Sequence, residues 1–588
     1  MNASERWRSA ITLLVFATVF ITLTVSSYRR ESATWDEPQH VVTGYNAFRF
    51  HDYRTDPEHP PFLRMWAALP LLAMGDIKVD LWKIDQSDPF SWVTGGQFFF
   101  CHDVLYVAND ADRLLYAARF MIVLLGVLLG MLLFCWAREL LGFWPAVMVL
   151  GLYTIEPNLL AHARLVTTDF GVTCFTFGTM YFLWRTARLL SVGNLCGLAG
   201  FFVLAQVSKF SALLLGPIVL ALLVVRVCQK KPWPMSLGRQ SDVRSRLEKL
   251  VAALSIVAML AAGTWLAIWA VYDFRYLPSA STTWRWDFQQ DPVILQRAPL
   301  LTKAVGWADE HRLLPNAYSQ GFLLGQVKAQ KRSGFLAGNY SVEGWWYFFP
   351  LAFLIKTPIS VILLLLTGVV LCAVRWRHFL NHNVYVLFPL AAFLGAAMMM
   401  NLNIGVRHIL PIQPFVLLLA GNAIAELYAS QRKPFRVLLG TLCFLAVLEF
   451  ALVCPHYLAF FNQFAGGPRN GHKYLVDSNL DWGQDLKGLK SWMDQHEVQH
   501  INLSYFGTAD PAYYKIDCTY LPGGAFFDEP LVKAPQLPGF VAVSATNLRG
   551  VYFSEGSRNI YQCLLETEPV AVIGYSIYVY RVERPWWQ

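Results

Sequence analysis

The stretch LYAARFMIVLLGVLLGMLLFCWA, residues 115–137, decides the class of fold. It holds one charged residue, Arg119, and as a helix it is long enough to cross a hydrocarbon core about 30 Å thick. Similar apolar runs recur along the 588 residues, of which 55% are hydrophobic and only 15% charged. This composition is far from that of a soluble protein. The sequence therefore predicts an α-helical polytopic membrane protein.

We predict about eleven transmembrane helices, at 9–28, 115–137, 142–160, 165–185, 193–208, 210–228, 249–272, 347–373, 384–401, 407–427 and 435–454. Lys209 alone separates the fifth span from the sixth. Arg6 and Arg8 flank the first span, which is too long for a signal peptide and lacks a small-residue cleavage site. We therefore expect it to remain as an anchor.

Lysine and arginine in alternate loops orient the chain. With the N-terminus inside, every inside loop is basic, through Arg138; Arg185 and Arg188; Arg226, Lys230, Lys231, Arg239, Arg244, Arg246 and Lys249; Arg375 and Arg377; and Arg432, Lys433 and Arg436. The long segments 29–114, 274–346 and 455–588 then lie outside. The net charge of +8 follows from this topology, so no nucleic-acid partner is needed to explain it.

The last part of the chain changes character, and we divide the protein into a transmembrane module, 1–454, and a C-terminal domain, 455–588. Within the second, SNLDWGQDLKGLKSWMDQH (478–496) predicts a capped amphipathic helix. Strand-like runs follow at 500–505, 539–545 and 570–581. We therefore expect a small α/β domain outside the membrane, where a disulfide between Cys518 and Cys563 is left open.

Acidic and basic residues gather at the outer ends of the predicted spans. They are Asp36, Glu37, Glu58, His59, Arg64, Glu156, His162, Arg164, Asp169, Lys209, Lys356, Arg407 and His408. A charge within the bilayer costs roughly 2.5–3.5 kcal/mol on insertion scales, so such residues usually mark a cavity or a pathway. Charged side chains that only extend to the membrane surface to contact water would be found at both membrane–water interfaces. Their location on one side therefore indicates a site.

Three motifs present most of these residues. ATWDEPQHVVTGYNAF (33–48) places an acidic pair directly after the first span. DPEHPPFLRMWAALPLL (56–72) is too short to span and is expected to lie in the interface. EPNLLAHARLVTTDFGVT (156–173) places Asp169 in the first turn of a span, where a carboxylate would also stabilise the helix N-terminus.

This series of motifs resembles the GT-C superfamily of membrane glycosyltransferases, and most closely the bacterial members of its protein O-mannosyltransferase and aminoarabinose transferase branch (glycosyltransferase family 39-like). The resemblance extends to GWWYFFPLAFLIKTP (344–358), NIGVRHILPIQPF (403–415), VDSNLDWGQDLKGL (476–489) and SYFGTADPAYY (504–514). It implies transfer of a sugar, with inversion, from a polyprenyl-phosphate donor to an acceptor hydroxyl on a protein, lipid or glycan. It also implies the inner membrane, with the site on the periplasmic side.

The resemblance also implies roles for individual residues. Asp36 matches the acid that activates the acceptor hydroxyl, and the predicted catalytic set is Asp36, Glu37 and Asp169. The departing phosphate requires fixed cations, and the predicted donor phosphate-binding set is His59, Arg64, Lys356, Arg407 and His408. The predicted substrate-binding set is Glu58, Arg164 and Lys209.

His59 departs from the pattern, because family members commonly carry lysine before the double proline. Histidine is only partly charged at neutral pH. We expect the neighbouring Glu58 to raise the pKa of the imidazole, so that the ring stays protonated and contacts the donor phosphate. The alternative is that His59 is a neutral hydrogen-bond donor fixed by the turn, and that Arg407 alone balances the phosphate.

A metal ion and three alternative functions remain open from the sequence. Asp36, Glu58 and Asp169 would offer oxygen ligands to Mg²⁺, so a divalent cation is an option, although no metal ligand is assigned. A lipid-linked sugar transporter or flippase is one alternative function, but related halves are not visible in the sequence. A non-catalytic relative is another, and an oligosaccharyltransferase-like enzyme would use a pyrophosphate donor and a metal.

Overall fold

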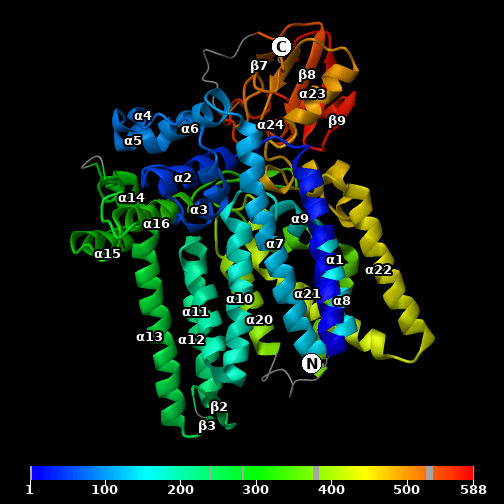
Figure 1. Cartoon of the computed structure of the whole chain (residues 1–588). Coiled ribbons are helices and arrows are strands. Elements are labelled where there is room, and N and C mark those ends of the chain that lie inside the picture. Colours follow the sequence, from blue (N-terminus) through cyan, green and yellow to red (C-terminus); the bar gives the residue numbers. More distant parts are fainter. Residues whose placement is uncertain (1–2, 239, 281–283, 375–382, 525–533, 587–588) are drawn as a thin grey trace.

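The computed structural model describes residues 1–588 except 1–2, 239, 281–283, 375–382, 525–533 and 587–588. A bundle of long helices carries an outer layer of short helices and, above it, a C-terminal sheet domain (Figure 1). The N-terminus lies at the opposite end of the bundle from this domain. Three of the inside arginines, Arg239, Arg375 and Arg377, lie outside the described residues.

Each predicted span coincides with helix. The helices are α1 (Ala3–Tyr28), α7 (Ala111–Leu141), α8 (Phe143–Ile155), α10 (Thr168–Arg188), α11 (Val192–Gln206), η4 with α12 (Phe210–Leu214 and Leu215–Cys228), α13 (Arg246–Val271), α17 (Phe348–Lys356), α18 (Ile359–Val374), α20 (Val384–Met398), η7 with α21 (Val406–Ile412 and Gln413–Ala429) and α22 (Lys433–Val453). Within the described residues, six helices are long and apolar enough to cross a membrane, or up to seven if one bent pair counts as a span.

The bent pair corrects the prediction of one straight span over 347–373. Helices α17 and α18 meet at an angle of 116°. Pro358 lies at the break, and proline lacks the N–H that would continue the hydrogen-bond ladder. The predicted spans 142–160, 165–185, 193–208 and 384–401, which are neither among the six nor in the bent pair, are shorter or less apolar helices of the same bundle.

Short helices form the outer layer. They are α2 (Glu37–Arg49), α3 with η1 (Phe62–Ala68 and Leu69–Ala73), α4 (Trp82–Asp85), α6 (Gln97–His102), α9 (Pro157–His162), α14 (Pro292–Arg297), α15 (Pro299–Glu310) and α16 (Asn316–Lys328). Asp36 is the N-cap residue of α2, with proline in its first turn. A Cβ atom on Gly44 would lie 2.1 Å from the carbonyl oxygen of Arg64, so α2 and α3 pack in backbone contact there.

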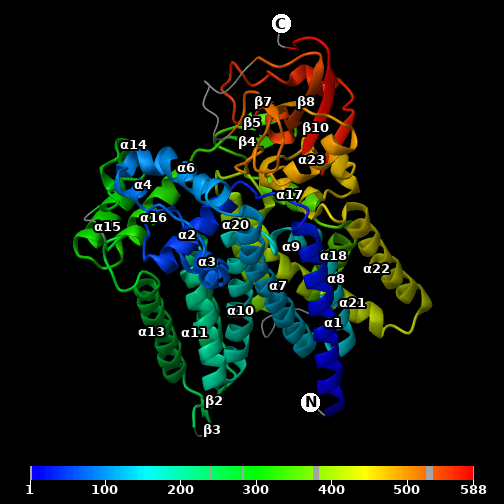
Figure 2. The ribbon, with the colours of Figure 1, turned by 45° about the horizontal axis from the view of Figure 1, so that its top comes forward.

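The C-terminal domain is built on a five-stranded sheet of order β7-β6-β8-β10-β9 (Figure 2). Its strands are β6 (Ile501–Ser504), β7 (Cys518–Tyr520), β8 (Gly539–Ser544), β9 (Ala571–Ile573) and β10 (Ile577–Val582). β6 is parallel to β7 and β8, whereas β10 is antiparallel to β8 and β9. With α23 (Leu486–Gln495) beside this sheet, the predicted small α/β domain is confirmed.

Two details of this domain differ from prediction, and a third concerns a disulfide that the sequence left open. The helix predicted from 478 begins only at Leu486, because the preceding residues form a 3₁₀ turn (Asp477–Asn479) and a packed loop. The strand predicted over 570–581 is a hairpin, which turns at Gly574 with φ +56°. Cys518 and Cys563 are free, so the disulfide left open by the sequence is not formed.

The loop before α23 joins the domain to the first outside segment. The amide of Ser32 donates to the carbonyl of Gln484 at 2.8 Å, and the amide of Trp35 donates to that of Trp482 at 2.9 Å. These bonds pair residues more than four hundred positions apart. The chain that leads into Asp36 is therefore held by the C-terminal domain.

The carboxyl group of Asp481 is buried at this junction and predicts a pH effect on stability. Burial, with some repulsion from Asp485 and Asp477, raises the pKa of Asp481 to about 8. An unfolded chain would titrate this group near pH 4, so its contribution to stability is complete below about pH 4 and is lost as the pH rises to about 8. Asp481→Asn, which keeps an acceptor for the amide of Thr546 (2.8 Å), should remove this loss.

The expected size is at most about 1.4 kcal/mol per pH unit between those limits. Thermal unfolding of the purified protein at pH 5 and pH 8.5 measures it. The wild-type Tm should fall more over this interval than the Tm of Asp481→Asn. Equal falls in both proteins would show that Asp481 is ionised in the folded state.

The arrangement in Figure 1 also predicts which segments share a side of the membrane. Single cysteines replacing the exposed Glu497, after α23, and the exposed Ser241, on β3 (Gln240–Val243), should react with an impermeant reagent from opposite sides. The parent chain supplies the background from native cysteines. Labelling of both positions from the same side would contradict the predicted topology.

Candidate functional site

Four charged side chains from distant parts of the sequence meet at the outer ends of the membrane helices. Asp36 precedes α2, Asp169 lies in the first turn of α10, Lys209 precedes η4, and Arg407 lies in η7. Arg407 Nη1 is 2.8 Å from Asp36 Oδ2 and 3.4 Å from Asp169 Oδ2. Lys209 Nζ contacts the other oxygen of Asp169. We call this group the charge cluster.

The charge cluster is balanced but unevenly exposed. Two carboxylates face two cations, which offsets the cost of taking these charges out of water. The side chain of Asp169 is only 2% exposed, whereas that of Asp36 is 28% exposed. Asp36 is therefore the acid of this cluster that a molecule arriving from the outside can reach.

The C-terminal domain holds Arg407 in place. The guanidinium carbon lies 4.2 Å from the centroid of the Trp482 ring, within cation–π range. Asn479 accepts from the amide of Val406 at 2.9 Å and donates to the carbonyl of Ile404 at 3.0 Å. Sequence reasoning did not assign Trp482 or Asn479 a role. The family-like stretch 476–489 was the one indication that this region matters.

The same tryptophan holds Asp36 through its backbone. The carbonyl of Trp482 accepts from the amide of Trp35. The Trp35 ring stacks on Phe506 with centroids 4.7 Å apart, and Thr508 Oγ1 donates to the carbonyl of Trp35 at 2.8 Å. The stretch 504–514 is therefore a packed loop that positions the residue next to Asp36.

A second buried group surrounds the turn that carries His59. Arg64 Nη1 donates to both the carbonyl and the carboxylate of Asp56, each at 2.7 Å, and Arg64 also donates to the carbonyl of His59. His40 Nδ1 lies 3.4 Å from Asp56 Oδ2. Arg64 is therefore committed to shaping this turn, and Asp56, which sequence reasoning left out of its sites, is its main partner.

The expectation that His59 is an imidazolium is wrong. Glu58 does not face the ring but pairs with Lys328, with Nζ and Oε1 2.6 Å apart. Burial lowers the pKa of His59 to about 3, and the positive charges of Lys209 and Arg64 contribute, although Asp56 opposes them. The pKa of the buried ring therefore makes it neutral at neutral pH.

His59 variants test this correction. His59→Gln, which stays neutral, should keep transfer within about threefold of the wild type and leave the pH–rate profile unchanged between pH 5 and 8. His59→Lys should impair the protein, because it adds a buried ammonium near Lys209 and Arg64. A more active lysine variant with a profile extended to high pH would restore the imidazolium interpretation.

The other predicted site residues divide into two groups. His408 belongs with the charge cluster, since its ring is buried with Lys209, Arg407 and Asp169 as electrostatic neighbours. Glu37 is fully buried, and despite that burial the ion pair with Arg119 lowers its pKa. Glu37 also accepts from the amide of Val166 at 2.9 Å, which ties α2 to the segment before α10.

Two predicted cations also lie apart from the charge cluster. Lys356 Nζ donates to the carbonyls of Leu458 (2.9 Å) and Asn479 (2.6 Å), so it braces the loop that holds Arg407. Arg164 is fully buried against Glu31. The structure therefore brings together Asp36, Asp169, Lys209, Arg407 and His408, with His59 beside them, and separates Glu37, Glu58, Arg64, Arg164 and Lys356.

The oxygen ligands considered for Mg²⁺ do not converge. Glu58 is paired with Lys328, while Asp36 and Asp169 share Arg407. Among the described residues, no group of three or more His, Cys, Asp or Glu side chains could hold a metal ion. The positive charge at this site comes from arginine and lysine.

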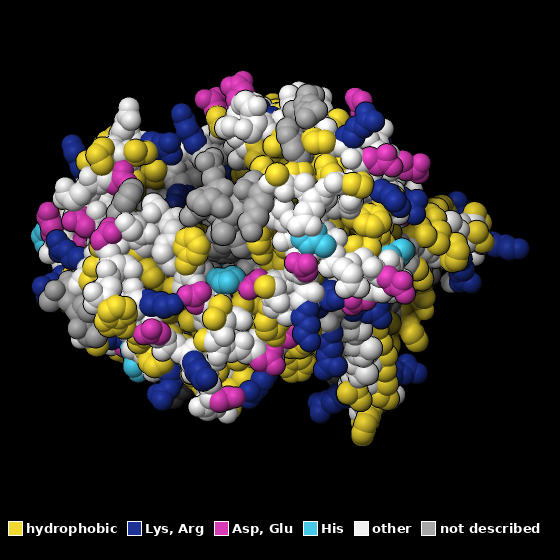
Figure 3. Space-filling model, turned by 90° about the horizontal axis from the view of Figure 1, so that it is seen from above, with side chains coloured by type: hydrophobic (Ala, Val, Ile, Leu, Met, Phe, Trp, Pro, Cys, Tyr) yellow, Lys and Arg dark blue, Asp and Glu magenta, His cyan; other side chains and the backbone are white. Residues whose placement is uncertain are grey.

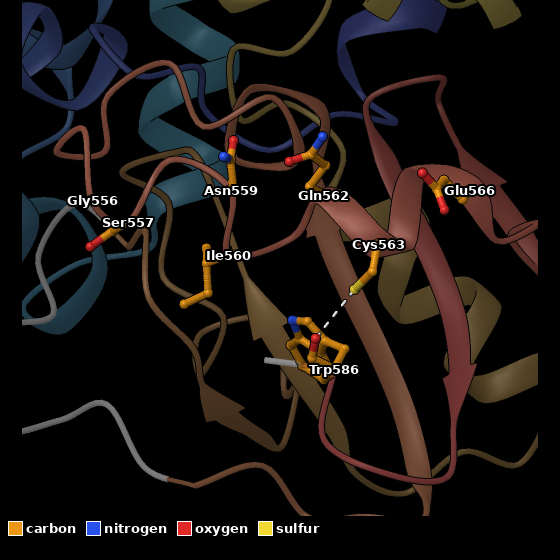
Figure 4. Close-up of a pocket in the computed structure, with 8 residues that line it drawn as sticks. All are labelled: Gly556, Ser557, Asn559, Ile560, Gln562, Cys563, Glu566 and Trp586. Atoms are coloured by element: carbon orange, nitrogen blue, oxygen red, sulfur yellow. Dashed lines mark hydrogen bonds between the residues drawn. The ribbon is translucent and has the colours of Figure 1, made fainter. Parts of the chain in front are cut away.

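A groove of about 600 Å³ lies on the C-terminal domain (Figure 4). Its lining consists of Gly556, Ser557, Asn559, Ile560, Gln562, Cys563, Glu566 and Trp586. It includes none of the predicted site residues. Elsewhere on the outer face, charges of both signs are mixed with apolar side chains (Figure 3).

Comparison with known proteins gives one family and several distant structures. Residues 110–239 match the family described as dolichyl-phosphate-mannose-protein mannosyltransferase. No curated protein matches the sequence. This match covers less than half of the chain and agrees with the mannosyltransferase branch that the motifs resemble. The long apolar helices identify a multi-pass membrane protein.

Among solved structures, the apo oligosaccharyltransferase of Archaeoglobus fulgidus is 10% identical over 78% of this chain and 56% of its own, with a TM-score of 0.48. The archaeal oligosaccharyltransferase AglB from Archaeoglobus fulgidus, in complex with an inhibitory peptide and a dolichol-phosphate, is 12% identical over 92% of this chain and 70% of its own, with a TM-score of 0.44. ArnT from Cupriavidus metallidurans, bound to undecaprenyl phosphate, is 13% identical over 96% and 97%, with a TM-score of 0.29. This chain thus spans little more than half the length of the apo oligosaccharyltransferase.

Proposed function

We propose that this protein transfers a sugar from a polyprenyl-phosphate donor to an acceptor hydroxyl, with inversion at the anomeric carbon. The observation that carries the proposal is the reachable carboxylate of Asp36 beside Arg407, at the outer ends of the membrane helices. Asp169 links Arg407 to a second cation, Lys209. A base and two fixed cations at that level suit a hydroxyl acceptor and an anionic leaving group. The family match over 110–239 supports the same chemistry.

In this mechanism Asp36 takes the proton of the acceptor hydroxyl as its oxygen attacks the anomeric carbon. The new carbon–oxygen bond forms on one face of the sugar while the bond to the phosphate oxygen breaks on the other. The bonding electrons leave with the polyprenyl phosphate. A positioned carboxylate contributes about 10²–10⁴-fold to such a step.

The two cations stabilise the charge that develops on the phosphate. Arg407 can bind two phosphate oxygens with its planar fork, and Lys209 supplies a compact second charge. Asp169 contacts both cations and holds them about the same point. When a phosphate draws Arg407 away from Asp36, the Asp36 carboxylate is freed to accept a proton.

The location of the site fits a donor that is dissolved in the membrane. A polyprenyl chain keeps its phosphate near the bilayer surface, which is the level of the charge cluster at the helix ends. We place the protein in the inner (cytoplasmic) membrane, with the site and the C-terminal domain on the periplasmic side. The acceptor hydroxyl belongs to a protein, a lipid or a glycan.

Donor chemistry distinguishes this proposal from transfer of the oligosaccharyltransferase type. Purified protein should use a polyprenyl-monophosphate sugar in the presence of EDTA, because Arg407 and Lys209 supply the positive charge. Use of a pyrophosphate-linked donor alone, with loss of activity in EDTA, would contradict the proposal. Movement of the intact donor across vesicles without bond cleavage would instead favour the flippase alternative.

A further inference from the structure

Helix α15 carries an apolar stripe that is largely exposed, with the His311 ring packed against Trp307 at one end, at a centroid distance of 4.7 Å. Leu300 and Trp307 are 82% and 57% exposed, and the exposed Ala304 lies between them. Positions separated by four and three residues share one face of a helix. The opposite face is buried against the same outside segment through Thr302, Val305 and Asp309. A contiguous apolar face of this kind usually meets a partner.

The position of α15 in the molecule indicates what its exposed apolar face contacts. In Figures 1 and 2, α15 lies at the outer end of α13 and runs across the direction of that helix. The carbonyl of Leu313, just after α15, accepts from Trp265 Nε1 at 3.1 Å and from Trp269 Nε1 at 3.2 Å. Trp265 is 54% exposed on the outer part of α13. Tryptophans at the end of a span mark the level of the lipid headgroups.

The charges beside the stripe fit the same level. Arg297, Lys303 and Arg312 are all exposed on or beside α15. Basic side chains that flank an apolar helix face are typical of helices lying in a membrane surface. We propose that α15 docks into the outer-leaflet interface of the bilayer, with Leu300, Ala304 and Trp307 at the boundary of the acyl chains.

Docking of α15 would also affect the turn that carries His59, which lies beside the charge cluster, because α15 is connected to this turn through α16. Asp309, on the buried face, accepts from Ser319 Oγ at 3.0 Å and thereby joins α15 to α16. A Cβ on Gly321 of α16 would lie 1.8 Å from the carbonyl oxygen of Pro57, so α16 lies directly against that turn. The turn carries His59 close to Lys209. Bilayer contact at α15 thus fixes a wall of the donor site, an extension that rests on the proposed function.

The docking itself can be measured without any assay of activity. A fluorescent amino acid is placed at position 307, or at the control position 82, and the protein is reconstituted in vesicles whose acyl chains are brominated. Trp82 is 65% exposed, and α4 lies farther from α13 than α15 does in both views. The probe at 307 should be quenched severalfold more than the probe at 82. Equal quenching would overturn the proposal.

The extension to the donor site needs a kinetic test in bilayers. Leu300→Glu with Trp307→Glu should raise KM for the polyprenyl-phosphate sugar about tenfold and leave kcat nearly unchanged, since the wall shifts but the charge cluster does not. Trp82→Glu is the matched control and should leave KM unchanged. An unchanged KM in the double variant would overturn the link to the site. Absence of transfer in the wild type would count against the proposed function alone, and the quenching result would still decide the docking.

Discussion

Asp36→Asn is expected to leave the protein folded and membrane-inserted while it lowers transfer by at least about 10²-fold, the lower end for loss of a general base. The amide is nearly the same size and keeps one acceptor oxygen for Arg407 Nη1, now 2.8 Å from the carboxylate. It cannot take up the acceptor proton. Single-turnover rates in bilayers, under conditions where chemistry limits the rate, measure the effect.

The matched control for this variant is Asp80→Asn, which removes a charge from an exposed aspartate of the same outside segment. Its turnover should equal that of the wild type. Near-normal turnover of Asp36→Asn would remove Asp36 from the base role.

Arg407→Gln is expected to have a second large effect, on both transfer and stability. Loss of one preorganised donor to developing negative charge costs about 10²–10³-fold in kcat. The same change removes a partner of Asp36 and Asp169, although Lys209 still faces the more deeply buried Asp169. We therefore expect the Tm to fall. The fall should be smaller than the one caused by leaving a buried carboxylate with no partner at all.

Arg407→Lys separates these two effects. The lysine keeps the charge, and with it much of the stability, but loses the planar fork that binds two phosphate oxygens. Its Tm should lie closer to that of the wild type, while its KM for the donor rises. A glutamine variant with wild-type kcat and KM would show that Arg407 only supports the fold.

The membrane architecture and much of the charge cluster could be predicted from the sequence, because both depend on local composition. Apolar length fixes the spans, and the one-sided distribution of polar residues brought Asp36, Asp169 and Arg407 into one hypothesis. The partners of Asp36 and Arg407 could not be predicted. Trp482 contacts Arg407 through its ring and Trp35 through its backbone, and Trp35 is more than four hundred residues away in the sequence. No rule of sequence spacing predicts contacts of this kind.

Local proximity in the sequence was also misleading. Glu58 and His59 are adjacent, yet the carboxylate turns to Lys328 and the imidazole is buried near Lys209. Glu37 follows Asp36 directly, yet the first turn of α2 buries Glu37 against Arg119 and leaves Asp36 partly exposed. Side chains that are adjacent in the sequence thus lie in different environments, because successive side chains at a turn or at the start of a helix project in different directions.

Release of free polyprenyl phosphate tests the central claim most directly. Purified wild-type protein and Asp36→Asn, each in bilayers, are supplied with a panel of polyprenyl-phosphate sugars and a membrane extract as the source of acceptor. The wild type should release the lipid phosphate from at least one donor when the extract is present, and the variant should release at least about 100-fold less. Equal release by the two proteins, or no release from any donor that the wild type binds, would contradict the account.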